Sequence, residues 1–156
     1  MRAGGAVAAI LMITTMLIGC GGGTGDDREA VAETVFAYID DVLEGYGDAA
    51  CEWLTRPQAR AVLKGARFKL PELKATSCAD ALSKVGRRLA PEVRESLRYA
   101  VVTNVRAEDD TATAELVGGS TLVRLIHDGE NWLIAGGLSF WTARHLPGQK
   151  LKGGTV

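Results

Sequence analysis

The sequence is poor in the residues that build most catalytic and metal sites. Its 156 residues include only two histidines and three cysteines. It contains no HExxH motif, no Ser-His-Asp set and no glycine-rich phosphate loop. Metal sites need more ligands at closer spacing, and nucleotide cofactors usually need a glycine fingerprint. We therefore expect no metal ion, no cofactor and no catalytic residue.

The chain also lacks a long apolar run and a strong charge of either sign. Its apolar stretch at residues 6–18 has 13 residues, whereas a helix needs about 20 to cross a bilayer. The formal net charge is −1. A loose basic stretch (Lys64, Arg67, Lys69 and Lys74) is interrupted by Glu72 and is interpreted as a solvated face. We therefore expect no nucleic-acid partner.

The N-terminus has the features of an export signal. Arg2 precedes the short apolar stretch, and the stretch ends in small residues before Cys20. This order is typical of a removable secretion signal, here residues 1–19. Residues 20–26 are rich in glycine and lack core-forming side chains, so they are expected to act as a flexible tether.

The quartet Leu17-Ile18-Gly19-Cys20 resembles the lipobox of bacterial lipoproteins. The resemblance implies lipid attachment to the Cys20 sulfur, cleavage after Gly19 and a lipid-anchored location on the extracytoplasmic face of the cell membrane. The chemistry is suitable, because a thiol is nucleophilic enough to accept the lipid. The alternative is an ordinary signal peptide with a buried or free Cys20.

The two remaining cysteines, Cys51 and Cys78, are expected to form a disulfide. An oxidising compartment favours this pairing in an exported protein. Closing a loop of about 28 residues would stabilise the fold by roughly 3–4 kcal/mol. Metal binding and a redox role are weaker alternatives, because neither histidines nor a Cys-x-x-Cys motif lie nearby.

Four helices are predicted in the first half of the domain. Capping residues mark their starts at Asp26 (with Glu29), Asp48, Thr55 and Ser77. The first helix ends at residues 45–47, the third at about residue 64, and the fourth at residues 90–91. Apolar residues repeat at helical spacing in the first and fourth helices: Val31, Val35, Tyr38 and Val42, and Cys78, Leu82, Val85 and Leu89.

The periodicity then changes to two, which is typical of strands. A strand is predicted from Leu97, with turns at residues 108–110, 118–119 and 128–129 and a bulge at 136–137. A two-residue turn at 128–129 would pair Leu125 with Trp132 and Arg124 with Leu133. We therefore predict an α+β domain (27–146) in which N-terminal helices pack on one face of a curved antiparallel sheet of about four strands. Residues 147–156 are expected to form a flexible tail.

Three stretches, AYIDDVLEGYGDAACEWLT (37–55), TATAEL (111–116) and ENWLIAGG (130–137), resemble the nuclear transport factor 2-like superfamily. More narrowly, the chain is similar to actinobacterial-type lipoproteins of that fold. The resemblance implies a cone: a bent sheet around a long helix, with an apolar cavity. In relatives the cavity is the active site of isomerases, dehydratases and cyclases, or it serves small-ligand binding or dimerisation.

A few side chains are candidates for a ligand site. Arg124 is a charge in mid-strand, and the others are aromatic. As candidates for a catalytic group, His127 is expected at the rim of the cavity and His145 is weaker. Asp40 and Asp41 are expected to face solvent. The ligand-site candidates are Arg124, Tyr38, Tyr99 and Trp132.

The favoured function is a non-enzymatic module that binds a small apolar or anionic ligand or a partner at the membrane. One alternative is an acid/base enzyme of the isomerase or dehydratase type. The other is a structural or assembly subunit of the envelope, working as a homodimer.

Overall fold

The computed structural model describes residues 25–117 and 121–138. The predicted signal peptide, Cys20, the turn at 118–119, His145 and the tail lie outside these residues. None of the helices in the described part combines the length and hydropathy of a membrane span.

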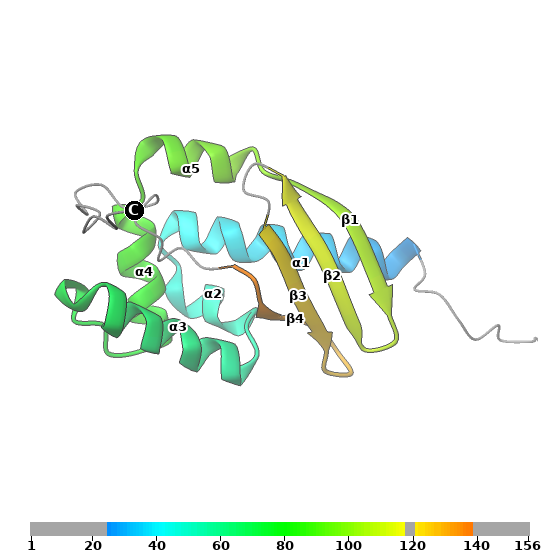
Figure 1. Ribbon diagram of the computed structural model, residues 1–156, viewed down its shortest axis with the longest axis horizontal. Helices are drawn as coiled ribbons and strands as arrows, with labels where there is room; N and C mark the ends of the chain where they lie inside the picture. Colours follow the sequence, from blue (N-terminus) through cyan, green and yellow to red (C-terminus); the bar gives the residue numbers. More distant parts are fainter. Residues whose placement is uncertain (1–24, 118–120, 139–156) are drawn as a thin grey trace, which may run out of the picture.

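Helices come first in the chain and strands second, which confirms the predicted α+β class (Figure 1). Helix α1 lies across one face of the sheet, and α2, α3 and α4 gather at one end of the molecule. The strands form one antiparallel sheet in the order β1-β2-β3-β4. The elements are α1 (Gly25–Glu44), α2 (Gly47–Glu52), α3 (Arg56–Lys69), the 3-10 helix η1 (Pro71–Leu73), α4 (Cys78–Arg88), α5 (Pro91–Arg98), β1 (Val101–Glu108), β2 (Thr111–Val117), β3 (Thr121–His127) and β4 (Trp132–Gly136).

The predicted apolar stripe of α1 is the centre of the core. Val31, Val35, Tyr38 and Val42 are completely buried. Burial of each such side chain stabilises the fold by about 1.5–3 kcal/mol relative to exposure. The helix begins at Gly25, one residue before the predicted cap. Asp26 therefore lies in the first turn, where the helix dipole favours a carboxylate.

The caps predicted for α3 and α4 are confirmed. The Gln58 amide donates to Thr55 Oγ1 at 3.3 Å, and the Asp80 amide donates to Ser77 Oγ at 3.0 Å. Helix α3 continues to Lys69, beyond the predicted end, because its inner side buries Val62 and Ala66 against the core.

The strand predicted from Leu97 is wrong at its start, since residues 91–98 form helix α5. Helix α4 ends at Arg88, and Pro91 begins the next helix, because its fixed φ suits a first helical position. Val93 and Leu97 are four residues apart and both pack against the core, which is helical spacing. Strand β1 begins only at Val101.

The alternation of side chains along β1 also changes beyond Thr103. The pairing register shifts between Thr103 and Arg106, and Asn104 has a φ of 50°. A bulge of this kind reverses which side chains face the core. Val105 therefore packs against the core, and Arg106 lies on the face of Val101.

The predicted register of β3 and β4 is wrong by two residues. His127 pairs with Trp132, Leu125 pairs with Ile134, and Arg124 lies opposite Gly136. The turn is longer than predicted because Asp128 Oδ1 accepts from the amides of Glu130 and Asn131, at 3.0 and 2.8 Å. These hydrogen bonds lower the pKa of Asp128.

A slip of two residues keeps every side chain on its predicted face, so Leu125 and Trp132 are both buried as expected. The predicted bulge at 136–137 is confirmed. The register shifts again beside Gly136, and Gly137 has a φ of 100°.

The predicted disulfide is present and joins α2 to α4 through Cys51 and Cys78. Close backbone contacts surround it. A Cβ atom at Gly47 would lie 1.9 Å from the Ala79 carbonyl oxygen, and one at Gly86 would lie 1.9 Å from that of Val42. Only glycine therefore allows α4 to approach α1 and α2 this closely.

We expect Gly86→Ala to lower the free energy of unfolding by about 2–3 kcal/mol, because the added methyl group forces α4 away from α1. At an open helical position the same change would stabilise by about 1 kcal/mol, so the sign of the effect is diagnostic. Urea denaturation of this variant, with the exposed Arg88→Ala as control, measures it. Stability equal to or above that of the parent would contradict the close contact.

Candidate functional site

The sheet has one face against α1 and one face that no described helix covers. Side chains alternate between them, with Ala112, Ala114 and Leu116 of β2 buried and their neighbours exposed or half-buried. We call the uncovered side the open face. Its residues are Val101, Thr103, Arg106, Glu108, Thr111, Thr113, Glu115, Val117, Leu122, Arg124, Ile126, Leu133 and Ala135.

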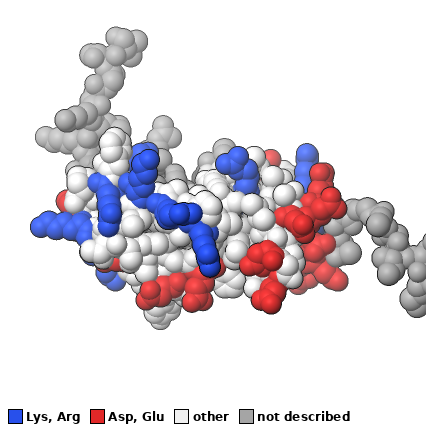
Figure 2. All heavy atoms as spheres, turned by 90° about the horizontal axis from the view of Figure 1, so that it is seen from below, with Lys and Arg blue, Asp and Glu red and all other residues white. Residues whose placement is uncertain are grey.

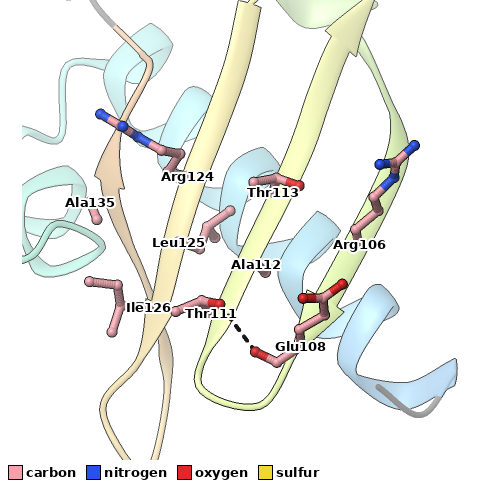
Figure 3. Close-up of a pocket in the computed structure, with 9 residues that line it drawn as sticks. All are labelled: Arg106, Glu108, Thr111, Ala112, Thr113, Arg124, Leu125, Ile126 and Ala135. Atoms are coloured by element: carbon pink, nitrogen blue, oxygen red, sulfur yellow. Dashed lines mark hydrogen bonds between the residues drawn. The ribbon is translucent and has the colours of Figure 1, made fainter. Parts of the chain in front are cut away.

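A groove of about 540 Å³ lies on the open face (Figure 3). Two cross-strand rows of side chains form it. In the first row, Thr113 of β2 pairs with Arg106 of β1 and with Arg124 of β3. Because neighbouring strands are about 4.8 Å apart, the two arginines begin about 10 Å from each other, with a threonine hydroxyl between them.

The second row is acidic at one end and apolar at the other. Thr111 pairs with Glu108 on one side and with Ile126 on the other. The Thr111 hydroxyl donates to the Glu108 carbonyl oxygen at 3.1 Å. Ile126 is 43% exposed, and Ala135 lies beside it in the groove. The groove therefore has a cationic row next to an apolar wall.

The guanidinium of Arg124 extends over β4, away from the second row (Figure 3). The position of Gly136 makes this possible, since a Cβ atom there would lie 3.1 Å from Arg124 Nη2. Neither Arg106 nor Arg124 takes part in the ion pairs Lys84–Asp80 and Arg98–Glu44 of the described residues, which lie outside the groove. The N–H groups of Arg106 and Arg124 are thus available to an anionic ligand, which guanidinium groups bind with two parallel hydrogen bonds.

The structure does not bring the four predicted ligand residues together. Of these, only Arg124 lines the groove. Tyr38 is completely buried in the core, where burial raises the pKa of its phenol. Tyr99 is 74% exposed at the end of α5, because the chain there is helical and not part of the sheet. Trp132 is buried on the opposite face of the sheet from Arg124.

A second hollow of about 520 Å³ lies between the start of α1 and the β3–β4 turn. Its lining includes Trp53 and Trp132 as well as His127, which is the last residue of β3. The His127 ring contacts the edge of Trp132, with the ring centroids 5.1 Å apart. Asp41 is half-buried and not simply solvated, because Trp53 Nε1 donates to its carboxylate at 2.8 Å.

The described residues contain no group of three His, Cys, Asp or Glu side chains placed to hold a metal ion. Within the same residues, the buried side chains that carry a hydroxyl group are Tyr38 and Thr34, and Thr34 donates to the Ala30 carbonyl oxygen. An acid/base enzyme of this fold would need a buried carboxylate or histidine facing a cavity. The described part of the chain offers none.

Comparisons with known proteins add no further guide. No family model, no curated protein and no solved structure matches the chain. The case for a function therefore depends on the residues and their geometry.

Removal of the Arg124 side chain should hardly change stability, since the residue is exposed. We expect Arg124→Ala to change the free energy of unfolding by less than about 0.5 kcal/mol. Arg94 is the contrasting case. It is half-buried and donates to the carbonyl oxygens of Leu43 and Gly86, at the ends of α1 and α4. Arg94→Ala should cost about 1.5–3 kcal/mol. Thermal denaturation of both variants checks the contrast, and equal losses would show that Arg124 is a structural residue.

Proposed function

We propose that this protein is a membrane-anchored lipoprotein whose extracytoplasmic domain binds a small anion with an apolar portion, without catalysis. The observation that carries the proposal is the row Arg106–Thr113–Arg124 beside the apolar wall of a 540 Å³ groove. Grooves of this size are typical of sites for small molecules.

The location is supported by the sequence around Cys20 and by the disulfide. The lipobox resemblance provides the anchor, and acyl chains attached to one residue hold a protein stably at a bilayer. A disulfide between Cys51 and Cys78 is in keeping with an oxidising compartment outside the cytoplasm.

The ligand class follows from the charges of the groove. Two arginines and one glutamate give the lining a net charge of +1, with both arginines in the same row. A carboxylate or phosphate would bind a guanidinium group of this row. An attached hydrocarbon portion would lie over Ile126 and Ala135.

A second candidate is an assembly role through the open face. Val101 and Val117 are cross-strand partners, and they and Leu122 are each more than half exposed. Apolar side chains clustered in this way are typical of surfaces that bind another protein. A homodimer formed through the open face would cover them.

Decanoate is a suitable probe for the groove, with decanol as its uncharged counterpart. The chain from residue 21 onward keeps every described residue and carries no lipid. We expect Arg106→Ala and Arg124→Ala each to weaken decanoate binding about tenfold in isothermal titration calorimetry, because each removes charge-assisted hydrogen bonds. Decanol binding should be unchanged.

The matched control is Arg98→Ala. Arg98 is an exposed arginine on α5, outside the groove, and its removal should change decanoate affinity less than twofold. Decanoate binding that survives in the Arg106→Ala/Arg124→Ala double variant would contradict the proposed site. A dimer in sedimentation velocity that Leu122→Glu dissociates would favour the assembly role instead.

A further inference from the structure

Helix α3 carries a strong positive charge that the groove does not involve. Its 14 residues, RPQARAVLKGARFK, include five lysines and arginines and no aspartate or glutamate. Among the exposed large apolar residues described, Phe68 near the end of this helix is the most exposed, at 83%. An exposed phenylalanine beside several positive charges is unusual for a surface that only contacts water.

The exposed side chains of α3 form a single surface. Pro57, Ala61, Lys64 and Phe68 follow one another at spacings of four, three and four, so they lie along one side of the helix. Val62 and Ala66 are buried on the other side. We call the exposed side the α3 outer face, and its residues are Pro57, Arg60, Ala61, Lys64, Arg67 and Phe68.

The cations of the α3 outer face are arranged around Phe68. A hollow of about 480 Å³ is lined by Arg60, Leu63, Lys64, Arg67 and Phe68. Arg67 is held in place, because its Nε donates to the Ala75 carbonyl oxygen at 3.0 Å and its Nη2 to that of Thr76 at 3.2 Å. Neither Arg60 nor Lys64 has an ion-pair partner among the residues that the structure describes.

Positive and negative side chains are distributed unevenly over the molecule. Seen from below, lysine and arginine side chains extend over the left and central part of the surface, with a smaller acidic group at its lower edge, and acidic side chains dominate the right-hand end (Figure 2). The basic part contains α3, and the acidic end is the one at which α1 begins. An anionic surface would therefore attract the α3 end more strongly than the end at which α1 begins.

We propose that the α3 outer face docks on the surface of an anionic lipid bilayer. Phe68 enters the boundary between headgroups and acyl chains, and Arg60 and Lys64 contact lipid phosphates. Basic helices with an apolar stripe bind membranes in this way, and each cation near an anionic surface adds to the attraction. The cations Arg60, Lys64 and Arg67 are spread along about two turns of the helix, which suits an extended anionic plane better than a single small ligand.

This contact is separate from both parts of the proposed function. It involves neither Cys20 nor the groove, so it can be measured on a chain that carries no lipid. The chain from residue 21 onward is mixed with phosphatidylglycerol vesicles or phosphatidylcholine vesicles, and the bound fraction is measured by cosedimentation. We expect binding to phosphatidylglycerol only, with affinity that falls as salt is raised.

The variants distinguish the contribution of positive charge to vesicle binding from that of Phe68 insertion. Arg60→Glu/Lys64→Glu should weaken binding to phosphatidylglycerol vesicles at least tenfold, and Phe68→Ala should weaken it about fivefold. Phe68→Trp should keep the parent affinity, because tryptophan also favours the membrane interface. The matched control, Arg28→Glu/Arg98→Glu, makes the same charge change at two exposed arginines outside α3 and the groove, and it should alter binding less than twofold.

All these positions are exposed, and circular dichroism verifies that each variant is folded. Equal binding of the parent to neutral vesicles, or undiminished binding of Arg60→Glu/Lys64→Glu, would overturn the proposal. Binding of soluble polyphosphate at the same affinity as vesicles, with no effect of Phe68→Ala, would also overturn it and indicate a site for free polyanions.

Discussion

The burial of one side of α1 is the constraint on which the rest of the structure depends. The helix contacts β1, β2 and β4 of the sheet, and it also contacts α2, α4 and α5. Its stripe of valines and Tyr38 is completely removed from solvent, and no other described helix has as many buried residues. Because α1 occupies one face of the sheet, the arginines of β1 and β3 are left on the other. The groove is thus a consequence of how the core is packed.

The helical end of the molecule is held by short contacts of a different kind. The Cys51–Cys78 disulfide, the glycines at 47 and 86, and the bridge by Ser83 all fix α4 against the α1–α2 junction. The Ser83 hydroxyl donates to the Gly45 carbonyl oxygen at 2.8 Å and accepts from the Gly47 amide at 3.1 Å. With α4 held in this way, α3 can keep most of its charged side exposed, since only Val62 and Ala66 of that helix are buried.

The sequence predicts those features that depend on a regular repeat or on a local cap. The stripe of α1 and the buried faces of β2 and β3 follow from periodicity, and the caps at Thr55 and Ser77 follow from the local sequence. The disulfide follows from the cysteine count and the expected compartment. Prediction fails where a single residue changes which side chains of a strand face the core. The bulge after Thr103 moves Arg106 to the open face, and Asp128 lengthens the turn before β4 through its own hydrogen bonds. The groove was therefore only half predicted, through Arg124, since no repeat indicates that Arg106 lies in the same row.

The location of the domain is the central claim of this account, because it determines which ligands and surfaces the protein meets. Mass spectrometry of the N-terminal peptide, from protein extracted with the cell membrane, tests this claim most directly. The account predicts a chain that begins at Cys20 with a diacylglyceryl group on its sulfur. A chain with an intact Met1 and an unmodified Cys20, recovered from the cytosol, would contradict it.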